Sequence, residues 1–191
     1  MKINNLTKNN VKALASSDPF KPALQGVLID PENAKAVVTN GHALIMYPLQ
    51  IEDGEEVSRA VAPADIFAPN IKQSESAEYC INGQAVRQDN AGTQEAKLID
   101  EQYPDYQKVI NPEGQAYTIT LDFSLLAKVA KAIPGGANDQ KPVRLHITGP
   151  ASAVKFETTE NYNGDEIKGL IMPIRDDQSG RHILNHEKGG K

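Results

Sequence analysis

The sequence predicts an α+β fold made of repeated units, each with one amphipathic helix followed by several antiparallel strands. Two observations carry this prediction. Apolar residues recur at helical spacing in three separate segments of the chain. Each of these segments is followed by short runs rich in Val, Ile and Leu that end in polar, Gly- or Pro-containing turns. Because the pattern occurs three times with little identity between copies, we expect three related helix-plus-sheet blocks.

The first block begins with a predicted helix within residues 5–15. A polar N-cap candidate precedes Val11, Leu14 and Ala15, whose spacing places them on one helical face. Two runs with the composition of strands follow this helix. These predicted strands are 23–29 and 34–47, and a turn at 30–33 separates them. We therefore expect a helix followed by a hairpin.

The second block is predicted to begin with a helix at 63–68. Pro63 is allowed in the first turn of a helix, whereas Pro69 limits the helix to a short or distorted element. Polar or Gly-containing turns bound the strand-like runs that follow. These predicted strands are 77–81, 84–88 and 94–99.

The third block has the clearest predicted helix, which Asp122 opens and Pro134 closes. Its apolar side contains Leu125, Leu126, Val129, Ala130 and Ile133. The predicted strands are 143–148, 153–158 and 167–174. The remaining residues, 176–191, are polar and Gly-rich at their end, so we expect a mobile tail.

Composition restricts the class of protein. With 191 residues, 39% of them hydrophobic, the chain is long enough to bury one or two cores without disulfides or metal ions. Its apolar stretches are far shorter than the ~20 residues that cross a bilayer, and its polar N-terminus lacks the apolar core of a secretory signal. We therefore expect a cytoplasmic protein with no membrane segment. The single cysteine, Cys80, has no cysteine partner and is expected to be a reduced, semi-buried strand residue.

Four segments carry motifs of a known family. Residues 24–28 read LQGVL, residues 37–44 read VVTNGHAL, residues 99–110 read IDEQYPDYQKVI and residues 169–175 read GLIMPIR. They are similar, in this order and spacing, to the "LNGVLF", "ATDGHRL", "L-x-x-x-F-P-D-Y-x-x-V-I-P" and "Y-V-V-M-P-M-R-L" motifs of the bacterial DNA polymerase III beta subunit, the sliding clamp. The third match is the most specific.

This resemblance implies a DNA-clamp fold and a domain assignment. Residues 1–111 resemble the middle domain of the family, and residues 112–175 resemble the second half of the last domain. The first domain has no counterpart, and 176–191 continue beyond the point where typical family chains end. The sequence departs from the family at Asn40, which replaces the usual aspartate, and at Ala43, where arginine is frequent. The chain is therefore predicted to be a shortened relative of the clamp.

The resemblance also implies an apolar cleft that accepts short peptides from polymerases, the clamp loader and repair proteins. A pocket lined by Met and branched aliphatic residues adapts to varied apolar anchors, and a few polar groups orient the peptide. Carried over to this chain, the predicted cleft consists of Leu24, Thr39, Gly41, His42, Leu44, Pro104, Lys108, Val109, Met172, Pro173, Ile174 and Arg175. The alternative is that these are ordinary strand and core residues.

Double-stranded DNA is the second partner that the resemblance implies. The net charge of −5 argues against a chain coated in basic residues, so any contact with DNA must be local. In clamps the helices line the central hole, and lysine holds phosphate there without reading bases. The predicted DNA-facing residues are Lys8, Lys12, Lys72, Lys128 and Lys131. Alternatively, these lysines only keep exposed helix faces soluble.

We find no catalytic centre and expect neither a metal ion nor a cofactor. The sequence has no Gly-x-Ser-x-Gly elbow, no phosphate-binding loop and no His-Glu-x-x-His motif. His182 and His186 are spaced for one face of a helix, but two histidines without a further ligand make a weak metal site. The resemblance then implies the function of a non-enzymatic processivity factor.

Two other functions stay open at this point. One is a clamp relative that does not slide and acts as an adaptor or inhibitor of replication proteins. The other is an enzyme of unknown type. Family rings place twelve helices around the hole, so three helices per chain predict a homo-oligomer of four copies. A fourth helix near 90–96 would reduce that number to three.

Overall fold

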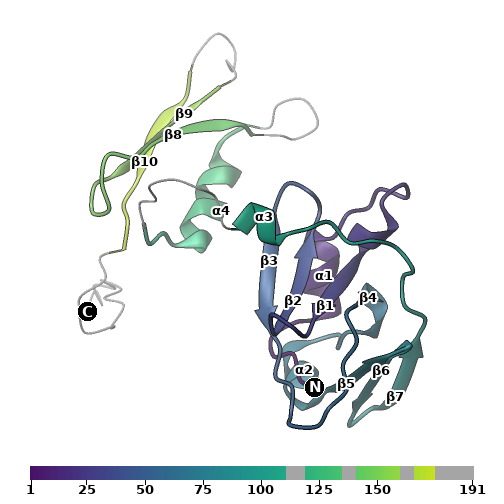
Figure 1. Cartoon of the computed structure of the whole chain (residues 1–191). Helices are drawn as coiled ribbons and strands as arrows, with labels where there is room; N and C mark the ends of the chain where they lie inside the picture. The colour runs from purple at the N-terminus through teal and green to yellow at the C-terminus, as the bar shows by residue number, and fades with distance from the viewer. Residues whose placement is uncertain (111–118, 135–140, 160–165, 175–191) are drawn as a thin grey trace, which may run out of the picture. The chain divides into compact units, whose positions relative to one another are not determined.

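The computed structural model describes residues 1–110, 119–134, 141–159 and 166–174. The chain forms two compact units, Met1–Asn111 and Pro112–Lys191 (Figure 1), each described here by itself. The assignment of these units to the middle and last domains of a clamp stays a prediction. The predicted tail at 176–191 and its two histidines lie outside the described residues.

The first block of unit 1 consists of α1 and a four-stranded antiparallel sheet. Thr7 caps α1 (Lys8–Leu14), because its side-chain oxygen accepts the N–H of Asn10 at 3.2 Å. The strand order is β3-β2-β1-β4. The strands are β1 (Gly26–Asp30), β2 (Lys35–Thr39), β3 (Leu44–Pro48) and β4 (Ala60–Pro63), and a short 3-10 helix, η1 (Pro22–Gln25), leads into β1.

The second block of unit 1 consists of α2 and a three-stranded antiparallel sheet. The 3-10 turn η2 (Ala64–Ile66) precedes α2 (Ile71–Ser76). The sheet order is β5-β6-β7, with β5 (Glu78–Asn82), β6 (Gln84–Asp89) and β7 (Gly92–Ala96). The buried Ser74 hydroxyl of α2 donates to the carbonyl oxygens of Ile3 and Leu6, both at 3.1 Å. This links the second block to the start of the first.

The two blocks of unit 1 share one apolar core. The first sheet contributes Val27, Ile29 and Val38, and the second contributes Tyr79 and Ile81, all of them buried. Full burial of side chains of this size contributes about 1.5–3 kcal/mol each. Apolar residues from both blocks therefore hold the two sheets together.

The opposite face of the first sheet carries a smaller cluster. Because side chains alternate along a strand, Leu28 and Val37 point away from the shared core and pack with Leu24, Tyr103 and Tyr106. The two tyrosines belong to the segment that follows β7 and leads into the short helix α3 (Gln107–Ile110). This cluster positions the candidate site described below.

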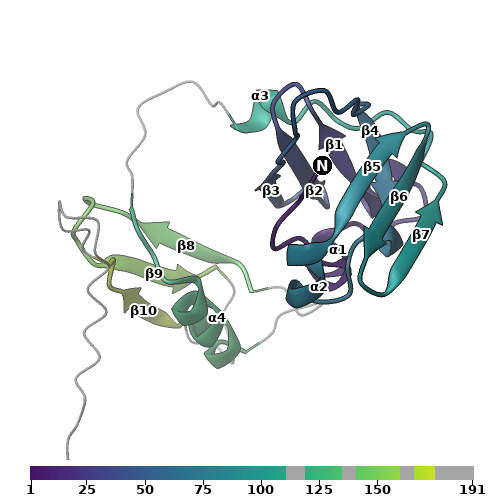
Figure 2. The ribbon, with the colours of Figure 1, turned by 90° about the horizontal axis from the view of Figure 1, so that it is seen from below.

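Unit 2 contains one block within its described residues. Asp122 caps α4 (Phe123–Ala132) by accepting the N–H of Ser124 at 2.7 Å. The antiparallel sheet has the order β10-β9-β8 and consists of β8 (Val143–His146), β9 (Val154–Thr158) and β10 (Lys168–Ile171). α4 lies against one face of this sheet (Figures 1 and 2). The small core there contains Ile133, Phe156 and Ile171.

The predicted α+β fold with three helix-plus-sheet blocks is confirmed, whereas several local predictions are wrong. The second helix does not lie at 63–68, where β4 ends at Pro63 and the short η2 follows. It begins at Ile71, because Pro69 has no N–H to donate and Asn70 supplies the N-cap by accepting the N–H of Gln73 at 3.0 Å.

One predicted strand and the alternative of a fourth helix are also wrong, and one strand was missed. The run 34–47 is two strands, β2 and β3, because a turn at 40–43 reverses the chain. Residues 92–96 form β7, so no fourth helix lies there, and β4 was not predicted. Cys80 lies on a strand as expected, but it is exposed. None of the described helices is long and apolar enough to cross a membrane.

Candidate functional site

A pocket of about 240 Å³ opens on the surface of unit 1 where three separate segments meet. The segments are the η1 helix, the turn between β2 and β3, and the stretch from Tyr103 to α3. The pocket is lined by Leu24, Thr39, Gly41, His42, Ala43, Leu44, Tyr103, Pro104, Asp105, Tyr106 and Val109. Its surface is therefore mostly apolar with a few polar groups, which is typical of sites that bind apolar anchors.

The turn at 40–43 is held by its own side chains. The Asn40 carboxamide oxygen accepts the N–H groups of His42 and Ala43 at 2.8 and 2.9 Å. The Thr39 hydroxyl accepts the N–H of Gly41 at 3.1 Å and donates to the Ala43 carbonyl at 2.6 Å. Gly41 has a φ of 91°, which favours glycine. These bonds fix one wall of the pocket, and Asn40 performs this task without the charge of an aspartate.

Tyr103 and Tyr106 fix the opposite wall to the first sheet. The Tyr103 hydroxyl donates to the carbonyl oxygen of Val37 at 3.0 Å, and the Tyr106 hydroxyl donates to a carboxylate oxygen of Asp30 at 2.9 Å. Burial raises the pKa of Tyr103. Burial also raises the pKa of Tyr106, and its hydrogen bond to the Asp30 carboxylate raises it further. Both hydroxyls therefore keep their protons and serve as donors.

Asp30 is the centre of a polar network that joins its carboxylate to Asn33, Arg59 and the pocket residue Tyr106. Its carboxylate is fully buried and accepts from the Asn33 side chain at 3.0 Å and from Arg59 at 2.8 Å, besides Tyr106. Burial alone would raise the pKa of this carboxyl. The hydrogen bonds from Asn33 and Tyr106, together with the charge of Arg59, outweigh burial and hold the pKa of Asp30 below its ordinary value. Asp30 is therefore ionised and fully paired.

The predicted cleft residues are only partly brought together. Seven of the twelve line this pocket, namely Leu24, Thr39, Gly41, His42, Leu44, Pro104 and Val109. Lys108 does not line it and pairs with Asp105 at 3.2 Å on the surface. Unit 2 holds the exposed Met172, the buried Pro173 and the partly buried Ile174, and Arg175 lies outside the described residues. The seven-residue cluster stays a candidate site. The contribution of the unit 2 residues to this site stays a prediction.

Four pocket residues were missed by the sequence analysis, namely Ala43, Tyr103, Asp105 and Tyr106. Tyr103 and Tyr106 are both in the YPDY stretch that carried the family resemblance, but only Pro104 between them was assigned to the cleft. The available signal was the motif itself, since two tyrosines three residues apart beside a proline predict a buried, hydrogen-bonded contact.

The predicted DNA-facing lysines have different surroundings. Lys8 and Lys12 lie on α1, and their ammonium groups are 2.6 and 3.5 Å from the same carboxylate oxygen of Asp65. The hydrogen bond from Lys8 lowers the pKa of Asp65, so this carboxylate offsets part of the charge of the pair. Lys72 is exposed on α2, and Lys128 and Lys131 are exposed on α4.

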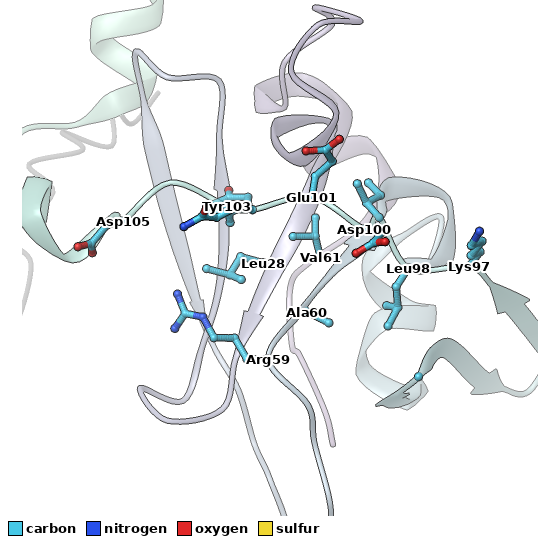
Figure 3. Close-up of a pocket in the computed structure, with 13 residues that line it drawn as sticks. Leu28, Arg59, Ala60, Val61, Lys97, Leu98, Asp100, Glu101, Tyr103 and Asp105 are labelled. Carbon is cyan, nitrogen blue, oxygen red and sulfur yellow. The ribbon is translucent and has the colours of Figure 1, made fainter.

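A second, larger cavity of about 800 Å³ lies along the segment 97–105, as Figure 3 shows. Tyr103 and Asp105 line both cavities. The second cavity carries Arg59 and Lys97 together with Asp100, Glu101 and Asp105. Cations and carboxylates are therefore mixed along its surface. Within the described residues, no group of three or more His, Cys, Asp or Glu side chains is arranged to hold a metal ion.

The fold of this chain is similar to that of bacterial sliding clamps. No family model matches the sequence, and no curated protein matches it. Among solved structures, one similar fold is that of the Caulobacter crescentus beta sliding clamp with PEG bound to a putative beta-motif tethering region. The alignment has a TM-score of 0.66 and 19% sequence identity, and it covers 88% of this chain. The Helicobacter pylori beta clamp bound to a DNA ligase peptide aligns with a TM-score of 0.60, 20% identity and 90% coverage.

A third neighbour is the DNA polymerase III subunit beta from Pseudomonas aeruginosa, with a TM-score of 0.65, 16% identity and 88% of this chain. In each of these three alignments the chain spans 49% of the solved clamp, about half its length. The similarity covers both units, because the aligned share exceeds the length of either one. The chain therefore has the α+β fold of the bacterial DNA polymerase III beta sliding clamps.

Proposed function

We propose that this chain is a non-enzymatic processivity factor of the sliding-clamp type, which contacts duplex DNA without sequence preference and docks partner proteins through the unit 1 pocket. The pocket is the observation that carries the proposal. Three motifs that are distant in sequence meet there around one apolar hollow. The partners are expected to be a DNA polymerase and clamp-loader-like proteins that present short apolar peptides.

The chemistry of the pocket fits the end of such a peptide. The buried Leu24, together with Leu44 and Val109, lines it, and the bulk of its surface is apolar. The solved Helicobacter pylori clamp, which shares this fold, carries a DNA ligase peptide. A Leu or Phe side chain placed in the pocket would lose its contact with water, and the exposed rim at His42 and Pro104 would contact the peptide backbone.

A titration of the full chain with a fluorescent peptide ending in Leu or Phe tests this proposal. We expect saturable binding in the micromolar range, measured by fluorescence anisotropy, and competition by the same peptide without the label. A peptide with the terminal Leu or Phe changed to Asp serves as the control and should not compete. If both peptides bind equally, the pocket does not select a peptide by its apolar terminal side chain.

Met172→Asp tests whether unit 2 contributes to the docking site. The resemblance places Met172 in the cleft, and its side chain is exposed within unit 2. A carboxylate in an apolar site costs several kcal/mol, so the peptide titration should show a loss of affinity of about 100-fold or more. Leu170→Asp, at an exposed leucine of β10 two residues before Met172, is the matched control. Unchanged affinity of Met172→Asp would confine the site to unit 1.

DNA binding is expected to be weak, independent of sequence and steeply dependent on salt, because lysine contacts with phosphate release counterions and read no base edges. The variant Lys128→Glu/Lys131→Glu should weaken it, as measured by anisotropy of labelled duplexes at several salt concentrations. Binding that survives high salt or prefers one duplex sequence would contradict a DNA-binding surface made of lysine contacts with phosphate.

Asp65→Asn should strengthen DNA binding. The carboxylate of Asp65 pairs with both α1 lysines, and its removal would leave two cations free for phosphate, with an expected gain of about three-fold in affinity. Asp18→Asn is the matched control, because it makes the same change in net charge but Asp18 pairs with Lys21 in a loop. Equal gains for both variants would show that net charge alone matters and that α1 does not face DNA.

The alternative function is an adaptor or inhibitor that has the clamp fold but does not slide on DNA. The pairing of Lys8 and Lys12 with Asp65 favours this alternative, because it weakens the positive field of α1. Normal peptide binding with no measurable affinity for duplexes at low salt would support the adaptor over the processivity factor.

A further inference from the structure

The first strand after each helix is covered in unit 1 but not in unit 2. In the first block Val27 and Ile29 of β1 are fully buried, and in the second block Ile81 of β5 is fully buried. These strands are covered because each block packs on the other through the shared core. In unit 2 the corresponding strand is β8, where Val143 is 38% exposed and Leu145 is 46% exposed.

The exposed residues of β8 lie on the side of the sheet where α4 packs. Leu145 is directly opposite Phe156 on β9, and paired residues share a face. Phe156 is buried with Ile133, which follows α4. The same face continues to Ile147, which is 49% exposed. We call Val143, Leu145 and Ile147 the β8 face. α4 covers the middle of the sheet on this side and leaves the β8 face open.

The charges of β8 lie on the other side of the sheet. Arg144 and His146 alternate with the residues of the β8 face, and both pair with Glu157 of β9, at 2.6 and 3.3 Å. The inward positions of β8, β9 and β10 carry no charged side chain within the described strands. Two identical β8 faces would therefore meet without like charges from the strands opposing each other, which favours self-association of this face.

We propose that the β8 face is covered by the β8 face of a second copy of this chain, so that two single blocks complete one composite clamp unit. Unit 1 shows the required packing, since a helix-plus-sheet block is completed there by another block of the same kind. The two blocks of unit 1 already cover each other, which leaves the unit 2 block of another copy as the matching surface. The contact joins the same patch on both subunits, as in a two-fold symmetric dimer.

This interface rests on the fold alone and not on the peptide pocket or on DNA binding. It predicts that two chains together contain three complete clamp units, two from their own pairs of blocks and one shared between them. A protein built in this way assembles through unit 2 even where peptide and DNA are absent.

Sedimentation velocity of the full chain at micromolar concentration tests the proposal. The wild-type protein should sediment as a dimer or a larger even assembly. Leu145→Asp places a carboxylate in the centre of the contact, so the dissociation constant of that contact should rise by about 100-fold or more and the mass should fall to half or to that of one chain. Ile147→Asp lies just beyond the end of β8 and should have the same effect with less risk to folding.

Leu170→Asp is the matched control, since Leu170 is 58% exposed on β10 and opposite Lys155, on the other side of the same sheet. It should leave the mass unchanged. Circular dichroism of each variant shows whether it is folded. A wild-type chain that sediments as a monomer would overturn the proposal, and so would an assembly that persists in folded Leu145→Asp and Ile147→Asp. Peptide binding measured on the same samples tests the proposed function separately. A chain that fails to assemble but still binds the peptide would overturn only the β8 contact.

Discussion

Replacement of Asp30 by alanine should lower the free energy of unfolding by about 2 kcal/mol, because it removes a buried, paired carboxylate and leaves the buried Tyr106 hydroxyl without an acceptor. The Asp30 carboxylate accepts from Asn33, Arg59 and Tyr106, and it is fully buried. Urea denaturation followed by circular dichroism measures the change. The peptide affinity should fall as well, since Tyr106 would lose the bond that fixes the pocket wall.

Two variants and a pH series serve as controls for this effect. Tyr106→Phe removes one hydrogen bond and should cost about 1 kcal/mol, and Asp30→Asn keeps an acceptor for Tyr106 but removes the charge. Because the folded pKa of Asp30 is lowered, its contribution is complete above the unfolded value of about 3.9 and is lost as the pH falls through the folded pKa. A loss below 1 kcal/mol for Asp30→Ala would mean that the network does not hold the wall.

Leu44→Asp should abolish peptide binding at micromolar concentrations. Leu44 begins β3 and lines the pocket of unit 1, where it packs with the cluster around Tyr103 and Tyr106. An ionised carboxylate at this position would have to be desolvated by the incoming apolar side chain, which predicts a loss of about 100-fold or more in affinity. Fluorescence anisotropy with the labelled peptide measures it.

Ile45→Asp is the matched control for Leu44→Asp. Ile45 is the next residue of the same strand, points to the opposite face and is 45% exposed. It introduces the same charge at nearly the same place but outside the pocket, so the peptide affinity should stay close to that of the wild type. Similar losses for both variants would indicate damage to β3 and not to a specific pocket.

Local sequence determines much of the fold and part of the site. The repeated order of helix and strands predicted the three blocks, and Thr7 and Asp122 cap helices at the places where polar residues precede apolar spacing. The seven pocket residues that the motifs identified belong to three short segments whose order and spacing are distinctive. Each of these features depends on residues close together in the chain.

Contacts between distant residues could not be predicted in this way. The bond from Tyr106 to Asp30 spans 76 residues, and the ion pair of Arg59 with Asp30 spans 29. Asp30 itself had been assigned to a turn, where an aspartate is ordinary. The second helix was misplaced for a local reason, since Pro63 and Pro69 bracket a segment that is too short for more than a 3-10 turn.

Backbone amide NMR of the isotope-labelled full chain, titrated with the unlabelled peptide ending in Leu or Phe, tests the location of the docking site most directly. The largest shift changes should occur at residues that line the pocket, namely Gly41, His42, Leu44, Tyr106 and Val109. The Asp-ended control peptide should leave these signals in place. Changes that centre on other residues of unit 1, or no changes at peptide concentrations that saturate the anisotropy signal, would contradict a peptide-docking pocket at this place.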